Sequence, residues 1–274
     1  MNYASFEDCL SRFDFFCFDA SGVLYNKPEG LIPGVRETIQ KIQVLKKEIF
    51  VVTNNSMKSS QDISDYLAEH GVVIDAERII SSGLGCCYDV KTRGILEAAG
   101  TIYISGDSSS YAYLKDLHVQ RVDDLNHAKA ILLMSNFNEC KEDDYQELID
   151  YLIKNPTLPV VCCNPDRYIL SRGKRFPVMG FWADYVSQKS ACEIHFFGKP
   201  YPAYFSMMAR ILSEKFSIHD LSKGCYVDDF VDNLEGCHLN ISKILPKESG
   251  LAFDLPEDQL NLNSIDLVIR DIAH

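Results

Sequence analysis

The sequence predicts an α/β fold with parallel sheets, because buried strand patterns alternate with amphipathic helical patterns along the chain. Four apolar residues, 15–18 (FFCF), stand directly before Asp19 and a turn at Gly22. Such a run is typical of a strand that is covered on both faces. A helical stretch and a second apolar run, 48–53 (EIFVVT), follow it. At 274 residues the chain is long enough for one large or two modest domains.

The expected elements continue in the same alternation. The stretch 34–47 has helical periodicity with Val35 and Ile39 on one side, and 59–70 predicts a helix that ends at Gly71. The other predicted strands are 79–83, 101–105, 129–135, 159–163, 194–198, 224–228 and 241–245, with helices at 143–154, 202–215 and 265–272.

The composition narrows the class of protein and of partner. The formal net charge of -12 argues against nucleic acid and anionic membranes as general partners, but it allows a locally positive site. The ten cysteines lie in apolar runs such as 160–163 (VVCC) without zinc or redox spacing, which predicts reduced thiols and a cytoplasmic protein. Glu7 and Asp8 stand where a signal peptide would be basic, and no apolar run approaches the ~20 residues of a membrane span.

Four polar clusters each follow a predicted buried strand, in the order DASG (19–22), TNNS (53–56), GKP (198–200) and DDFVDN (228–233). Open α/β sheets place their chemistry at the carboxyl ends of strands. Taken alone, Asp19 would be equally consistent with a residue that caps the following turn. Together the clusters supply a nucleophile, hydroxyl and amide donors, a cation and hard oxygen ligands, and these groups suit phosphoryl transfer.

Each cluster has an expected role in that chemistry. Asp19 is the expected nucleophile, which attacks phosphorus to give an aspartyl-phosphate. Thr53 and Asn54 are expected to bind the phosphate oxygens, and Lys199 to bind them and offset the charge of the transition state. The expected cofactor is Mg²⁺, bridging Asp19, Asp228 and the phosphate.

These clusters resemble the haloacid dehalogenase superfamily, and within it the class IIA phosphatases, whose large α/β cap lies between the second and third motifs. Relatives of p-nitrophenyl phosphatase, pyridoxal phosphatase and phosphoglycolate phosphatase belong to that class. The resemblance covers most of residues 14–240. It rests on the clusters and on the segments LIPGVRETIQ (31–40), FVVTNNS (50–56), ISSG (80–83), CCNPDR (162–167) and FFGKPYPAYF (196–205).

The resemblance implies a Rossmann-like core with a parallel sheet, made of residues 1–83 and 194–274, and an inserted cap at 84–193. The spacing agrees, since the first two clusters leave room for one crossover helix, whereas more than a hundred residues follow Gly83 before Phe196. The resemblance also implies pairing of two copies through their caps.

The cap loop after strand 159–163 is the expected specificity element. In the family the matching loop faces the active site and helps to choose the substrate, which implies such a role for Asn164, Asp166 and Arg167. Arg167 is the expected contact for an anionic substrate group. The alternative is an ordinary turn that begins with Asn and Pro.

The first motif departs from the family pattern at Ser21, where a second aspartate usually protonates the leaving oxygen and later activates water. General acid–base catalysis contributes about 10²–10⁴-fold, so its loss would raise the barrier by roughly 3–5 kcal/mol. Metal binding is expected to survive, because in the family this residue reaches the metal through its backbone carbonyl.

The fourth motif departs from the pattern as well. Asn233 replaces the second acid and removes one charge from the metal site. Asp232 lies four residues after Asp228, so on a helical turn the two would share a face and Asp232 would restore that charge. Asp229, as a direct neighbour, is expected to point elsewhere. The alternative for this cluster is a solvated helix start.

The sequence therefore predicts a Mg²⁺-dependent phosphomonoester hydrolase for a small phosphorylated metabolite, slowed by the change at Ser21. The alternative is a protein with the same pocket that binds a phosphorylated ligand or partner without significant turnover. Carbon–halogen cleavage also uses a strand-end aspartate. The dehalogenases, however, carry their cap between the first two motifs and need no metal, so the spacing argues against that reaction.

Overall fold

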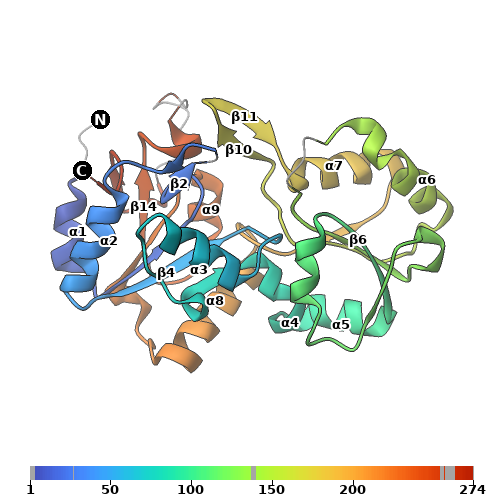
Figure 1. Ribbon diagram of the computed structural model, residues 1–274, viewed down its shortest axis with the longest axis horizontal. Helices are drawn as coiled ribbons and strands as arrows, with labels where there is room; N and C mark the ends of the chain where they lie inside the picture. Colours follow the sequence, from blue (N-terminus) through green and yellow to red (C-terminus); the bar gives the residue numbers. More distant parts are fainter. Residues whose placement is uncertain (1–3, 27, 137–139, 254–255, 257–262, 274) are drawn as a thin grey trace.

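A computed structural model describes residues 4–26, 28–136, 140–253, 256 and 263–273. The chain forms two lobes, a core and a cap, each built on its own parallel sheet (Figure 1). The core sheet has six strands in the order β15-β14-β13-β1-β4-β5, and the cap sheet has five in the order β12-β9-β8-β6-β7. The predicted α/β fold with parallel sheets is confirmed.

The core is a three-layer sandwich around β1 (Phe15–Phe18). Phe16 and Phe18 pack in one apolar cluster with the helices α1, α2 and α3, whereas Phe15 and Cys17 pack in another with α8. This alternation is what a strand buried on both faces requires. The other core elements are β4 (Glu48–Thr53), β5 (Ile79–Ser81), β13 (Gly224–Val227), β14 (Ser242–Pro246), β15 (Leu267–Ile269), α1 (Phe6–Arg12), α2 (Val35–Val44), α3 (Ser60–Glu69), α8 (Pro202–Phe216) and α9 (Val231–Gly236).

Local sequence explains where the core helices begin. Ser59 and Asp62 form a capping box at the start of α3, in which the Ser59 hydroxyl accepts from the Asp62 N–H at 3.2 Å. Pro202 stands in the first turn of α8, where its missing N–H costs nothing. A small antiparallel pair, β2 (Tyr25–Asn26) and β3 (Gly30–Leu31), follows the turn after β1.

The cap places its helices around a second sheet, and its β10–β11 hairpin reaches back over the core (Figure 1). Trp182 lies in the cap's own apolar cluster and stacks on Tyr145, with ring centroids 5.2 Å apart. The cap elements are α4 (Gly85–Tyr88), α5 (Val90–Ala99), β6 (Thr101–Ser105), β7 (Gln120–Val122), β8 (Ala130–Leu133), α6 (Gln146–Lys154), β9 (Val160–Cys162), β10 (Tyr168–Ser171), β11 (Lys174–Pro177), α7 (Met179–Ser190) and β12 (Ile194–Phe196).

Short 3₁₀ helices connect many of these elements. They are η1 (Ala76–Arg78), η2 (Ser82–Leu84), η3 (Ser108–Tyr113), η4 (Leu125–His127), η5 (Glu142–Tyr145), η6 (Leu221–Lys223) and η7 (Gly250–Ala252). No helix in the described ranges is long and apolar enough to cross a bilayer.

The structure corrects two predicted elements. The sequence predicts 194–198 as a core strand, but β12 pairs with β9 at the edge of the cap sheet, so the cap sheet extends past residue 193. The sequence also predicts a helix at 265–272, but β15 there is a strand that pairs with β14. Both pairings join distant segments, and a short apolar run carries no local signal for its partner.

Hydrogen bonds tie the cap to the core at several places. The hydroxyls of Ser56, after β4, and Ser135, after β8, lie 3.0 Å apart. At the tip of the β10–β11 hairpin, the Arg172 N–H donates to Glu29 Oε1 at 2.9 Å. The cap is therefore seated on the core, over the ends of the core strands that carry the predicted chemistry.

Apolar packing is also continuous across the two lobes. Leu132 and Val161 of the cap sheet belong to the same buried cluster as Phe50, Phe197 and Phe205 of the core lobe. Gly85, at the start of α4, permits this contact, since a Cβ there would lie 2.2 Å from the ring of Phe197.

Candidate active site

Asp19 lies at the carboxyl end of β1, at the centre of the core sheet. Its backbone N–H donates to the carbonyl of Val227 at 2.8 Å, which continues the pairing of β1 with β13 by one residue. The following turn needs glycine at position 22, because the φ of +87° there favours a residue without a Cβ. The side chain of Asp19 is 10% exposed, so the carboxylate is nearly removed from solvent.

Lys199 is the cation of the site and is fully buried between two carboxylates. Its Nζ donates to Asp19 Oδ1 at 2.7 Å, to Asp228 Oδ2 at 2.6 Å and to the carbonyl of Val52 at 3.1 Å. Burial alone would lower the pKa of Lys199, but the charges of Asp19 and Asp228 outweigh it and raise that pKa well above its ordinary value. Lys199 is therefore a permanent positive charge beside the nucleophile.

Asn54 fixes the backbone of Lys199 from both sides. Its Oδ1 accepts from the Lys199 N–H at 2.7 Å, and its Nδ2 donates to the Lys199 carbonyl at 2.8 Å. The same Nδ2 donates to Asp166 Oδ1 of the cap at 2.7 Å. Thr53, one residue earlier, is buried, and its hydroxyl accepts from the Asn55 N–H at 3.2 Å.

Asp228 is buried at the end of β13 and receives hydrogen bonds from several elements. Besides Lys199, the Tyr226 hydroxyl donates to Oδ2, the Phe230 N–H to Oδ1 at 2.9 Å, and Asn233 Nδ2 to Oδ1 at 3.1 Å. The Oδ1 of Asn233 is buried, and it has no hydrogen-bond partner among the described residues. A buried carbonyl oxygen in that condition is available to a ligand.

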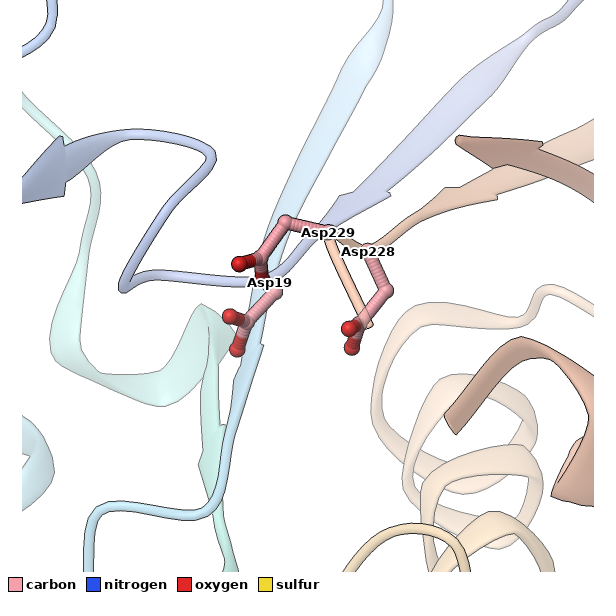
Figure 2. Close-up of side chains that lie close together, drawn as sticks. All are labelled: Asp19, Asp228 and Asp229. Atoms are coloured by element: carbon pink, nitrogen blue, oxygen red, sulfur yellow. The ribbon is translucent and has the colours of Figure 1, made fainter. Parts of the chain in front are cut away.

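Asp229 completes a group of three carboxylates with Asp19 and Asp228, whose oxygens lie within 4.8 Å of one another. Figure 2 shows the three side chains gathered at the ends of neighbouring strands. Asp229 Oδ2 accepts from the Leu251 N–H at 2.5 Å. Burial, together with the charges of Asp228 and Asp19, raises the pKa of Asp229 well above its ordinary value.

The sequence predicts Asp232 at the metal site and Asp229 pointing elsewhere, and the structure shows the opposite. Asp232 is exposed on α9 and lies outside the group of three carboxylates, whereas Asp229 belongs to it. The reason is that α9 begins only at Val231, so Asp228 stands before the helix and the helical spacing from 228 to 232 does not apply.

The donor set fits a hard divalent cation. Carboxylate and amide oxygens are the ligands that Mg²⁺ and Ca²⁺ take in proteins. Burial raises the pKa of Asp19 to about 7, with Lys199 opposing the shift and Asp228 adding to it, so a further positive charge beside Asp19 would stabilise its carboxylate. The unpartnered Oδ1 of Asn233 adds a neutral oxygen to the same region.

Comparison with known proteins shows which families and proteins this chain resembles. A profile of the haloacid dehalogenase-like hydrolases matches residues 16–120, which include Asp19 and Asn54. The chain is also 25% identical to a 4-nitrophenylphosphatase of Schizosaccharomyces pombe over 279 residues, which cover 92% of this chain and 91% of that protein. The chain is therefore similar to the haloacid dehalogenase-like hydrolases over residues 16–120, and to a 4-nitrophenylphosphatase over most of its length.

Solved structures share the fold over most or all of the chain. A "possible sugar phosphatase" from Cytophaga hutchinsonii matches with a TM-score of 0.81 at 22% identity, over 100% of this chain and 99% of that one. A glycerol phosphate phosphatase of Mycobacterium tuberculosis, solved in complex with magnesium, matches with a TM-score of 0.69 at 16% identity, over 86% of this chain and 68% of that one.

The fold brings most of the predicted site residues together. Direct hydrogen bonds link Asp19, Asn54, Lys199, Asp228 and Asn233 in one network. Thr53 adjoins this network through its neighbour Asn54. Ser21 lies half-buried two residues after Asp19, at the start of the turn.

The cap residues divide into two groups. Asp166 reaches the core, since it accepts from Asn54 Nδ2 at 2.7 Å, whereas Asn164 Nδ2 donates to Ser135 Oγ at 2.8 Å within the cap. Arg167 is exposed and pairs with Asp184 of α7 at 2.7 Å, within the cap. The predicted contact of Arg167 with an anionic substrate group stays a prediction.

Tyr226 is a site residue that the sequence does not reveal. It lies inside the apolar strand GCYV, where a tyrosine predicts core packing, and only its hydroxyl reaches Asp228. Its position two residues before Asp228 on the same face of β13 is the one available signal.

Proposed function

We propose that the protein is a Mg²⁺-dependent phosphomonoester hydrolase that acts on a small phosphorylated metabolite through an aspartyl-phosphate at Asp19. The observation that carries this proposal is the buried Lys199, which bridges Asp19 and Asp228 at 2.7 and 2.6 Å. A nucleophile, a fixed cation and a carboxylate group are thereby assembled at one sheet edge, as phosphoryl transfer requires. The 4-nitrophenylphosphatase among the relatives supports the same reaction class.

In this proposal the chain's own groups position and stabilise the phosphoryl group. Asp19 attacks phosphorus in line with the leaving oxygen. Lys199 and the Thr53 hydroxyl bind the phosphoryl oxygens, where the charge of Lys199 stabilises the transition state. Asn54 differs from its predicted role as a phosphate ligand, because its amide atoms hold the Lys199 backbone and Asp166. We assign Asn54 as a positioning residue.

Asp19, Asp228 and Asn233 are the side chains that would hold Mg²⁺. Asp229 belongs to the same group of carboxylates, and the backbone carbonyl of Ser21 would be a further ligand. When bound, the cation neutralises phosphate charge and orients the substrate for attack. The magnesium complex of the Mycobacterium tuberculosis relative supports this choice of metal. The carboxylate group of Asp19, Asp228 and Asp229 supports it independently.

The decisive experiment measures phosphate release from 4-nitrophenyl phosphate with and without Mg²⁺. We expect release that depends on Mg²⁺ and falls by at least about 10³-fold in Asp19→Asn, since the amide cannot form the covalent intermediate. Asp8→Asn is the matched control, because Asp8 is an exposed carboxylate of α1 away from the site. Equal rates in the wild type and in Asp19→Asn would refute the hydrolase.

The alternative function is binding of a phosphorylated ligand without turnover, and Ser21 and Asn233 favour it. Ser21 offers no acid for the leaving group, and Asn233 lowers the charge of the cation site. Calorimetry separates the two functions. Saturable, Mg²⁺-dependent binding of a phosphomonoester that stays intact for hours would support the alternative.

Metal binding is expected to raise the midpoint of thermal unfolding. At a Mg²⁺ concentration near 100 times Kd, the folded state gains about 2.7 kcal/mol, or roughly 5–10 °C for a chain of this size. Asp228→Asn should abolish the shift, while Asp232→Asn, in which the replaced carboxylate is exposed, should keep it. A shift that is lost in Asp232→Asn and kept in Asp228→Asn would contradict the proposed ligands.

Two wider expectations accompany the proposal. The buried thiols support a cytoplasmic location, since eight of the ten free cysteines, all but Cys87 and Cys140, are buried. Pairing of two copies through their caps rests on the family resemblance alone.

A further inference from the structure

The proposed hydrolysis needs a proton donor for the leaving oxygen, and Ser21 stands at the position from which an aspartate usually supplies it in the family. An alkoxide is a poor leaving group, so an acid that protonates it contributes about 10²–10⁴-fold. The Ser21 hydroxyl is far too weak an acid at neutral pH. Lys199 Nζ is committed to Asp19, Asp228 and a backbone carbonyl, and the positive charge it holds is what the phosphate needs.

The cap delivers one further carboxyl group to this place. Asp166 Oδ1 accepts from Asn54 Nδ2 at 2.7 Å, and the same amide grips the backbone of Lys199. The second oxygen of Asp166, Oδ2, receives no hydrogen bond from the described part of the chain. One oxygen is therefore anchored, and the other is available to a substrate.

Two glycines allow the loop of Asp166 to pack closely against its neighbours. At Gly198 a Cβ would lie 2.5 Å from Pro165 Cδ, so the cap loop rests directly on the residue before Lys199. At Gly180 a Cβ would lie 2.1 Å from the Pro165 carbonyl oxygen, and the Gly180 N–H donates to the Asp166 carbonyl at 2.9 Å. The loop packs between α7 and the segment that carries Lys199. This packing restricts the position of the Asp166 carboxyl group, as catalysis requires.

The electrostatic surroundings suit a group that alternates between acid and base. Burial raises the pKa of Asp166 to about 6, with Lys199 and Asn54 opposing the shift and Asp228 adding to it. The negative charge of Asp166 in turn contributes to the raised pKa of Asp19, so the two carboxyl groups interact electrostatically. A carboxyl group whose pKa lies near neutral pH can both donate and accept a proton effectively.

We propose that Asp166 of the cap is the general acid and base of the reaction, in the place that Ser21 leaves vacant. This assignment rests on the proposed hydrolase function. It makes the cap a source of catalysis as well as of specificity, because turnover then requires the cap to be seated on the core.

The two steps balance as follows. In the first, an Asp19 carboxylate oxygen forms a bond to phosphorus, the phosphorus–oxygen ester bond breaks, and the Asp166 proton passes to the leaving oxygen to give the free alcohol. In the second, Asp166 takes a proton from water, the water oxygen bonds to phosphorus, and the bond between phosphorus and Asp19 breaks. The products are inorganic phosphate, the Asp19 carboxylate and protonated Asp166.

The test uses the variant Asp166→Asn, which keeps an acceptor for Asn54 and removes only the proton-transfer function. With 4-nitrophenyl phosphate, whose leaving group needs no proton, we expect a rapid burst of about one 4-nitrophenolate per protein. A steady state about 10²–10⁴-fold slower than in the wild type should follow. With an alkyl phosphate the burst should vanish. Asp184→Asn, which changes the cap carboxylate paired with Arg167, is the control and should behave as the wild type.

A rescue experiment separates catalysis from folding. Ser21→Asp in the Asp166→Asn background should restore alkyl phosphate turnover by at least tenfold, because it supplies a carboxyl group beside the nucleophile. Loss of the 4-nitrophenolate burst in Asp166→Asn, or unchanged steady-state rates on both substrates, would overturn the assignment. Failure of the hydrolase proposal gives a different result, since the wild type itself would then match Asp19→Asn.

Discussion

Lys199→Met is expected to destabilise the protein by about 3–5 kcal/mol and to abolish turnover. Removing one partner of a buried ion pair leaves uncompensated charge, and here two carboxylates, those of Asp19 and Asp228, lose their shared cation at once. Methionine is similar in length to lysine and fills much of the space of the Lys199 side chain. The loss of stability therefore reflects the missing charge more than lost packing. Urea unfolding without divalent cations measures the loss of stability.

The cost of Lys199→Met should also depend on pH in a defined direction. Burial already raises the pKa of Asp19 in the folded protein, and the loss of Lys199, which opposes that shift, raises it further in the variant. A carboxyl group with a raised folded-state pKa lowers stability increasingly as the pH rises through that range. We therefore expect the difference between variant and wild type to be smaller at pH 5 than at pH 8.

Lys247→Met is the matched control for this charge effect. Lys247 is also buried, but its Nζ donates to the carbonyls of Ala252 and Phe253, at 2.7 and 3.2 Å, and to no described carboxylate. Its loss leaves carbonyl groups unpaired, at a cost of about 1–3 kcal/mol that changes little between pH 5 and pH 8. Equal losses with equal pH dependence in the two variants would contradict the role of Lys199.

Gly22→Ala is expected to cost roughly 2–5 kcal/mol, as the sum of backbone strain and a collision. The φ of Gly22 is +87°, and a Cβ there would lie 2.3 Å from Asp229 Oδ2. Asp229 cannot simply move away, because a Cβ built on Gly250 would lie 2.0 Å from the same oxygen on another side. The variant should therefore lose both stability and part of the Mg²⁺-induced thermal shift.

Gly100→Ala isolates the contribution of backbone strain. Gly100 has a similar φ of +73°, but a Cβ there would meet no heavy atom within 4 Å. The strain alone should cost about 1–2 kcal/mol, and the Mg²⁺ shift should be unchanged. If the two alanine variants lose the same stability and keep the same shift, the contact between Gly22 and Asp229 has no energetic weight.

Local sequence is sufficient to predict the strands that carry the chemistry. The runs before Asp19 and within 48–53 are apolar throughout, and the structure buries both strands at the centre of the core sheet. Because neighbouring parallel strands end at one edge of a sheet, the positions of Asp19 after β1 and Asp228 after β13 are sufficient to predict that they lie together. Lys199 follows β12 of the cap sheet instead, and its contact with both carboxylates does not follow from that argument.

The remaining details depend on tertiary contacts that no local pattern encodes. The side chain of Asp229 turns inward because Gly22 and Gly250, far apart in sequence, leave space for it. The side-chain amide of Asn54 bonds to Lys199 and Asp166, and the cap loop that carries Asp166 is more than a hundred residues away in the sequence. The sheet that β12 joins likewise depends on β9 and not on the three residues of the strand itself.

The apolar cluster that runs from Phe50 in the core through Phe197 to Leu132 in the cap has a consequence for cooperativity. Two domains that meet only at a polar hinge can melt independently, but a shared apolar interior leaves no boundary along which one part can lose its structure alone. Excising the cap would strip the covering from Phe197 and its neighbours. We therefore expect the two lobes to lose their structure in one cooperative transition.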